Sequence, residues 1–179
     1  MNPRFITLIS IVAAAALYRV LPHPVNFTPV GAIALFAGAK FADKYLALAV
    51  TLCAMLVADL FLGFYNSMAF VYAGIAAMVA IGFWLKNNNS FSKTIIATLS
   101  GSAAFYLLSN LGVWMMTDMY PHTAAGLVTN YLAAIPFLQN SLISNLLFVG
   151  LFFGAFHLLE NKFSQLRLQN SQQNNLQAQ

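Results

Sequence analysis

Apolar residues form six runs along the chain, and short segments rich in polar, glycine or proline residues separate them. A membrane-spanning helix needs about 20 mostly apolar residues, so long runs of this kind predict helices that cross a membrane. The pattern predicts an all-α polytopic membrane protein, a six-helix bundle. The predicted spans are residues 5–21, 29–39, 45–62, 68–85, 93–115 and 141–159.

The basic residues predict the orientation of these spans. Lysine and arginine are in excess in the cytoplasmic loops of membrane proteins. If both termini are cytoplasmic, seven of the eight basic residues fall on the inner side, and only Arg19 falls on the outer side. Leaving out the span at 29–39, or adding a seventh span at 123–138, places two basic residues outside instead. We therefore expect residues 123–138 to form a membrane-dipping or interfacial element on the outer side.

The second predicted span has only 11 residues, which is about 17 Å of helix. A helix this short cannot face lipid, because unsatisfied backbone polar groups are costly in hydrocarbon. Either its neighbours surround it, or residues 26–28 extend it. Small residues four positions apart favour close helix packing. They occur at Ala34/Gly38, Ala73/Ala77, Ala97/Gly101 and Gly150/Gly154.

The two ends of the chain differ in character. Arg4 and the apolar run after it are typical of a signal peptide, but the rest of the chain also favours membrane insertion, so we expect an uncleaved first span. Residues 161–179 are rich in glutamine and asparagine and have no apolar period. This composition predicts a disordered cytoplasmic tail after a six-span membrane domain at residues 1–160.

Composition excludes the common alternatives. Hydrophobic residues make up 60% of the 179 residues and charged residues 7%, whereas a soluble domain has about 25% charged residues. Sixteen phenylalanines argue against a disordered chain. The net charge of +4 comes from basic residues that form no patch, so we expect a lipid bilayer as partner and no nucleic acid.

Motifs for catalysis and metal binding are missing from the sequence. No nucleophile–base pair, carboxylate dyad, Walker A loop, dinucleotide fingerprint or zinc-ligand spacing occurs, so we expect no enzyme, no cofactor and no metal site. Energised transport would therefore need a partner. The single cysteine, Cys53, lies in the middle of the third predicted span, where we expect a small core residue.

Polar side chains gather toward the predicted outer side, whereas the inner halves of the spans hold mostly serine, threonine and alanine. Polar groups within a membrane usually face a cavity or a partner. Aromatic rings beside amides suit a flat, partly polar small molecule, so we predict an outward-facing pocket. The expected substrate-binding residues are His23, Asn26, Asp59, Tyr65, Asn66, Tyr72, Asn110, Trp114, Tyr120, His122, Asn130 and Tyr131.

Several of these residues have a structural alternative. Asp59, the only acid inside a predicted span, either pairs with Arg19 or serves substrate contact or proton coupling. The segment 22–29, which has three prolines, is either a lid over the pocket or a rigid connector. His122 either ligates a metal or lies in solvent, and solvent is favoured. Trp114 and the nearby tyrosines suit either a membrane-interface belt or a stacking platform.

Four motifs carry a resemblance: residues 21–32 (LPHPVNFTPVGA), 57–64 (VADLFLGF), 109–114 (SNLGVW) and 134–137 (AIPF). Over about residues 4–160 the chain resembles an uncharacterised bacterial membrane family described as putative transport proteins. That family is in turn similar to the substrate-binding S components of energy-coupling factor (ECF) vitamin transporters. The resemblance implies a multi-pass protein of the bacterial cytoplasmic (inner) membrane, with an outward pocket capped by the first loop and by the connection between the fifth and sixth spans.

S components often carry an Ala-x-x-x-Ala pattern in the first helix, which docks on the transmembrane coupling subunit. In this chain only Ser10/Ala14 approximates that pattern. An ECF-type energising module (the coupling subunit plus ATPases) therefore stays one possible partner, and a solitary transporter is the alternative.

Three functions remain open at this stage. The favoured one is the binding and uptake of a small vitamin-like molecule by an S-component type of protein. The second is a membrane scaffold or assembly subunit with the same bundle, and the third and weakest is an intramembrane enzyme built on Asp59 with His23 or His122. The sequence does not identify the substrate.

Overall fold

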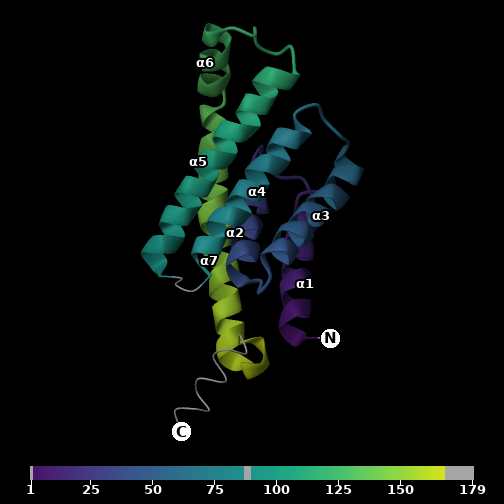
Figure 1. Ribbon diagram of the computed structural model, residues 1–179, viewed down its shortest axis with the longest axis vertical. Helices are drawn as coiled ribbons and strands as arrows, with labels where there is room; N and C mark the ends of the chain where they lie inside the picture. Colours follow the sequence, from purple (N-terminus) through teal and green to yellow (C-terminus); the bar gives the residue numbers. More distant parts are fainter. Residues whose placement is uncertain (1, 87–89, 168–179) are drawn as a thin grey trace.

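The computed structural model describes residues 2–86 and 90–167, and the regular elements of this part of the chain are all helices (Figure 1). The all-α prediction is confirmed. In chain order the elements are α1 (Pro3–Tyr18), α2 (Val30–Lys40), α3 (Lys44–Leu62), α4 (Met68–Trp84), α5 (Phe91–Met116), α6 (Ala124–Ala133), α7 (Ile135–Lys162) and the 3-10 turn η1 (Ser164–Leu166).

Three helices, α3, α5 and α7, are long and apolar enough to cross a membrane, which indicates a membrane protein. The apolar helices α1, α2 and α4 are shorter, with 16, 11 and 17 residues. Each of the six predicted spans thus contains an apolar helix, and the crossing of the membrane by all six stays a prediction.

Helix α2 lies at the centre of the bundle. All of its residues, from Val30 to Lys40, are buried, and it contacts α1, α3, α4, α5 and α7. Residues 26–28 do not continue the helix. Neighbouring helices therefore surround α2 on every side, which is the first of the two alternatives expected for so short an apolar helix.

Glycines allow α2 and α4 to touch through their backbones. A Cβ added at Gly38 would lie 2.2 Å from the Val79 carbonyl oxygen, and one at Gly82 would lie 2.5 Å from the Leu35 carbonyl oxygen. The predicted close packing at Gly38 and Gly101 is present. At Gly150 and Gly154 it is absent, because nothing lies within 4 Å of an added Cβ at either position.

The start of the last long helix differs from the prediction. Helix α7 begins at Ile135, six residues before the predicted start of the last span, and only Ala134 separates it from α6. Pro136 lies in the first turn of α7, where a backbone N–H has no helical partner and proline is tolerated. The proline therefore lies at the start of α7, directly after the boundary with α6.

Cys53 was predicted in the core and is exposed on α3, so that prediction is wrong. The opposite face of α3 carries the buried residues Thr51, Met55 and Asp59. A residue in an apolar run can face lipid as easily as the core, since both environments are apolar.

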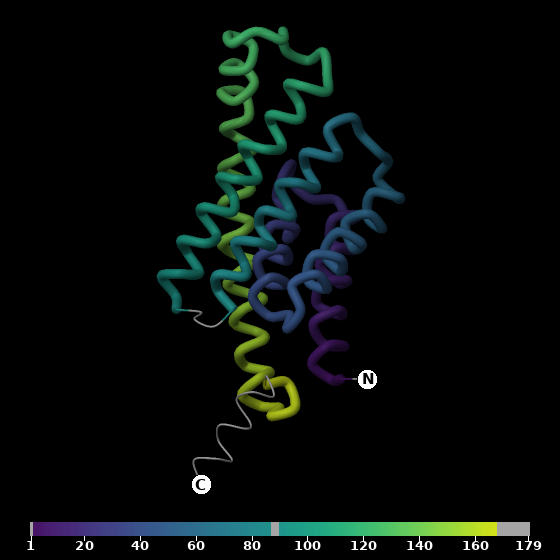
Figure 2. The backbone as a smooth tube through the Cα atoms, viewed as in Figure 1, coloured from purple at the N-terminus to yellow at the C-terminus, as the bar shows by residue number. Residues whose placement is uncertain are grey.

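The chain reverses direction at each connection between the six apolar helices. Figures 1 and 2 show the start of α1, the α2–α3 turn and the end of α7 toward one end of the bundle, and α6 and the α3–α4 and α5–α6 loops toward the other. The predicted tail is outside the described residues from 168 onward, and its first part forms η1, where Leu166 is buried. The predicted domain boundary after residue 160 stays a prediction.

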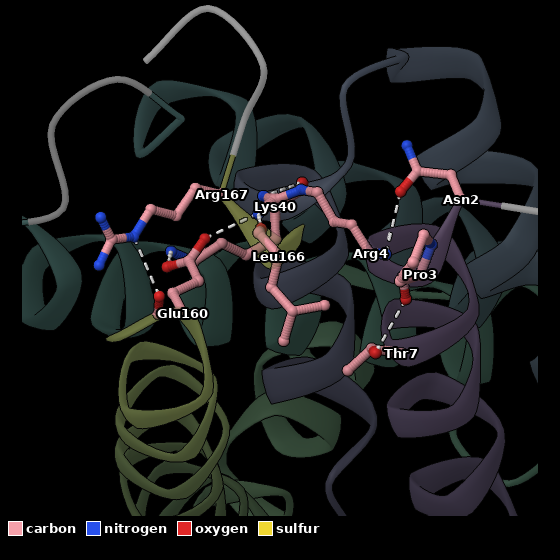
Figure 3. Close-up of polar contacts among 8 residues, drawn as sticks. All are labelled: Asn2, Pro3, Arg4, Thr7, Lys40, Glu160, Leu166 and Arg167. Atoms are coloured by element: carbon pink, nitrogen blue, oxygen red, sulfur yellow. Dashed lines mark hydrogen bonds and ion pairs between the residues drawn. The ribbon is translucent and has the colours of Figure 1, made fainter. Parts of the chain in front are cut away.

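Charged side chains join three helices at the end where α1 starts, and we call them the Glu160 cluster: Arg4, Lys40 and Glu160 (Figure 3). The Glu160 carboxylate lies 2.7 Å from Arg4 Nη1 and 3.4 Å from Lys40 Nζ. Arg4 also donates hydrogen bonds to the carbonyls of Lys40 and Leu166, and both cations lie over the Phe156 ring. The cluster thus ties α1, α2, α7 and η1 together.

Candidate functional site

A cavity of about 680 Å³ lies toward the opposite end of the bundle. Residues of the α1–α2, α3–α4 and α5–α6 loops line it, together with parts of α3, α4, α5, α6 and α7. This volume is within the range of about 300–1,000 Å³ that is typical of small-molecule sites.

One face of α5 forms a large part of the cavity wall. Its members recur at spacings of three and four residues, as one side of an α-helix requires. They are Ser102, Phe105, Tyr106, Ser109, Asn110 and Val113. The face combines aromatic rings with hydroxyl and amide groups, so it can both stack on a flat molecule and form hydrogen bonds with it.

Half of the predicted binding residues line this cavity: His23, Asn26, Tyr65, Asn110, Tyr120 and Asn130. The other half are not part of its lining: Asp59, Asn66, Tyr72, Trp114, His122 and Tyr131. Five members of the second group instead contact other side chains or backbone carbonyls: Asp59, Tyr72, Trp114, His122 and Tyr131.

Asp59 is fully buried on α3 behind the cavity wall. Its Oδ1 lies 2.5 Å from Arg19 Nη1, and Tyr72 donates a hydrogen bond of 2.8 Å to Oδ2. The Arg19–Asp59 pair that the sequence offered as the structural alternative is therefore present. Arg19 itself lines the cavity, with 16% of its side chain exposed.

Tyr65 also belongs to the cavity wall, on the α3–α4 loop. Its hydroxyl oxygen is buried beside the Arg19 guanidinium, and the part of the chain that the structure describes offers its O–H no acceptor. Burial and the nearby Asp59 carboxylate raise the pKa of Tyr65, and Arg19 opposes this rise. The hydroxyl stays protonated at neutral pH and is a donor without an acceptor.

Side chains of α7 fix the proline-rich segment 22–29. Asn140, Ser141 and Ser144 donate hydrogen bonds to the carbonyls of Val25, Asn26 and Thr28, over 3.0, 3.4 and 2.7 Å. These three bonds satisfy loop carbonyls and attach the segment to α7 beside the cavity. Its role as a lid or as a rigid connector stays a prediction. Asn26 has a positive φ of 59°, a conformation that asparagine adopts more readily than most residues.

His23 is positioned within the same segment by two backbone carbonyls and one ring. Its Nδ1 lies 2.9 Å from the Pro24 oxygen and its Nε2 lies 3.2 Å from the Arg19 oxygen. The ring stacks on Tyr18 at a centroid distance of 5.9 Å. These contacts hold His23 at the edge of the cavity without a metal-binding partner among them.

Helix α6 is attached to α5 by side chains that donate to carbonyls. Asn130 donates to the Asn110 carbonyl over 2.8 Å, and Tyr131 donates to the Leu107 carbonyl over 2.8 Å. Tyr106 donates in turn to the Tyr131 carbonyl. Tyr131 therefore supports the wall from outside the cavity, and the amide of the buried Asn130 does so from within it.

Trp114 and His122 also contact backbone carbonyls, in the α5–α6 connection. Trp114 Nε1 donates to the Pro121 carbonyl over 3.0 Å. The rings of Trp114 and His122 meet edge to face, with their centroids 5.6 Å apart. His122 Nε2 lies 3.4 Å from the Thr117 oxygen, and its side chain is exposed, as the favoured alternative for this residue expected. Among the residues that the structure describes, no three His, Cys, Asp or Glu side chains gather around one point.

Sequence reasoning did not select several wall residues, among them Ser102, Phe105, Tyr106, Ser109 and Arg19. The first four share the α5 face with Asn110, so a search for polar and aromatic residues at helical spacing around Asn110 finds them. The sequence marks Arg19 as the outer basic residue and as a partner of Asp59, and not as a wall residue. Its place in the wall depends on how α1 and α3 pack, which spacing along one chain segment does not reveal.

Comparison with known proteins identifies the family of the chain. Residues 1–166 match the model of a protein family described as a family of unknown function (DUF6580). The chain belongs to this family. No curated protein and no solved structure matches the chain.

Proposed function

We propose that this protein is a six-span protein of the bacterial inner membrane that binds a small vitamin-like molecule from the outer side for uptake. The observation that carries the proposal is the cavity of about 680 Å³, lined by aromatic, amide and hydroxyl side chains toward one end of an apolar helix bundle. The sequence resemblance to ECF S components favours the same function.

The cavity wall suggests how a ligand is held. Phe105 and Tyr106 of α5 offer ring surfaces, and Phe137 of α7 and Tyr120 of the α5–α6 loop offer two more. Asn110 donates one side-chain N–H to the Tyr106 carbonyl over 2.8 Å, so its amide oxygen and its second N–H are the groups that it offers to a ligand. Rings and a small number of oriented polar groups are typical of small-molecule sites.

The charged residues support the proposed orientation. The Glu160 cluster and the lysines Lys44, Lys86 and Lys93 lie at or beside the helix ends opposite the cavity. Basic residues mark the cytoplasmic side, so the cavity end faces outward. The energy source remains part of the proposal: an ECF-type module with a transmembrane coupling subunit and ATPases, or no module at all.

Native mass spectrometry of the protein in mild detergent tests the proposal. We expect a discrete bound mass on the wild-type protein and its loss in Asn110→Ala. The matched control is Asn161→Ala, an exposed asparagine at the opposite end of the bundle, which should keep the bound mass. An empty wild-type protein that brings down another membrane protein, regardless of Asn110, would overturn the proposal in favour of the membrane scaffold or assembly subunit.

A further inference from the structure

The charge of the cavity wall limits the ligands that it can accept. Among the described residues that line the cavity, Arg19 carries the only formal charge when histidine is neutral. Asp59, the nearest acid, is fully buried behind the wall and is not part of the lining. A cationic ligand would therefore lie beside a guanidinium and have no carboxylate at the surface that it touches.

Asp59 binds the Arg19 guanidinium at a single nitrogen atom. Its bond to Arg19 is at Nη1, over 2.5 Å, and Met55 Sδ also contacts Nη1, at 3.9 Å. An arginine side chain carries five N–H donors in a planar fork. Asp59 and Met55 contact Nη1, and the Tyr65 hydroxyl lies beside the guanidinium, so part of the fork remains for a ligand. That fork matches the two oxygens of a carboxylate or phosphate.

Tyr65 adds a second donor beside Arg19 that lacks an acceptor. Its hydroxyl is buried, and the neighbouring guanidinium can donate to the hydroxyl oxygen but cannot accept its proton. Buried hydroxyls without a partner are rare in proteins. An anionic group seated against Arg19 would bring an acceptor oxygen next to Tyr65 as well.

We infer that the cavity takes an anionic small molecule, a ring-bearing carboxylate or phosphate whose charged group binds Arg19 and Tyr65. This inference rests on the proposed binding function and names its substrate class. Asp59 is then a positioning residue, which fixes the guanidinium from behind, and the α5 face contacts the apolar body of the ligand.

The test captures small molecules from a water-soluble extract of bacterial cells on the detergent-purified protein, and mass spectrometry identifies what is released after washing. We expect the enriched molecules to carry a carboxylate or phosphate. Enrichment should fall about tenfold or more in the double variant Arg19→Gln/Asp59→Asn, because a charge-assisted hydrogen bond is lost. The double variant removes both charges together and leaves no buried unpaired ion, and its melting temperature verifies that it is folded.

Two further measurements distinguish direct contact from a structural role of Arg19. An acid captured by the wild-type protein should bind at least about tenfold more tightly than its own primary amide. Asp59→Asn should increase that preference, because the Arg19 charge is then no longer offset by a carboxylate behind it, whereas a purely structural pair would leave the preference unchanged and so contradict the inference.

The outcomes separate the two proposals. Enrichment of neutral or cationic molecules that survives in the double variant would overturn the anion inference and leave the binding function in place. Enrichment of phospholipid alone, measured in a separate lipid extract, would also overturn it. If the wild-type protein enriches nothing from either extract, the proposed binding function itself fails.

Discussion

At the scale of single residues, polar side chains around the cavity form hydrogen bonds with backbone carbonyls more often than with one another. Asn140 and Ser144 bind carbonyls of the proline-rich segment, and Trp114 and Tyr131 bind carbonyls of the α5–α6 region. Loop backbone near a membrane has little water to bind, so each unsatisfied carbonyl would be costly. These side chains therefore make irregular backbone possible beside the cavity.

The sequence could predict where the polar residues gather, but not which of them line the cavity and which bind backbone carbonyls. Their concentration toward one end predicted a site there, and the cavity lies at that end with His23, Asn26 and Asn110 in its wall. The sequence could not separate wall residues from supporting ones, because Trp114 and Tyr131 have the same chemistry as a ligand contact. Only the packed structure shows that their polar atoms bind carbonyls.

Removing the acid of the Glu160 cluster should destabilise the protein. Arg4 and Lys40 are both buried and share this carboxylate, so Glu160→Ala removes an ion-pair partner from each of them. We expect a loss of about 3 kcal/mol in the free energy of unfolding, measured as a lower melting temperature in detergent. Asp118→Ala removes an exposed acid near the other end and should change the melting temperature little; equal effects of the two substitutions would contradict this account.

At the scale of the elements, the short central helix α2 determines how the bundle packs. An 11-residue apolar helix could be predicted from the sequence, and its full burial follows from the cost of exposing it to lipid. The boundary between α6 and α7 could not be predicted, since Pro136 is compatible with both a helix start and a break. Which small-residue pairs meet a neighbour was equally hidden, because Gly38 and Gly150 lie in similar sequence patterns.

The contact between α2 and α4 should not tolerate a side chain at Gly38. Because an added Cβ would lie 2.2 Å from the Val79 backbone oxygen, Gly38→Ala requires the two helices to move apart. We expect about 1–3 kcal/mol of destabilisation, measured by thermal unfolding in detergent. Gly150→Ala is the matched control, with open space around the added methyl group, and should be neutral; an unchanged stability of Gly38→Ala would show that the helices do not pack this closely.

At the scale of the whole molecule, the two ends of the bundle differ in chemistry. One end is joined by buried charged groups, and toward the other lies a cavity with one cation and many aromatic and amide groups. Seven of eight basic residues on one predicted side indicated this polarity from the sequence. The central claim is that the cavity opens to the outside of the cell.

A single-cysteine accessibility measurement tests that claim most directly. In a Cys53→Ser background, Ser109→Cys places a thiol in the cavity wall and Asn161→Cys places one at the opposite end. We predict that a membrane-impermeant maleimide added to intact spheroplasts labels the Ser109→Cys protein, and labels the Asn161→Cys protein only after the membrane is permeabilised. The reverse pattern would invert the proposed orientation. A thiol at position 109 that stays unlabelled after permeabilisation would contradict an open cavity.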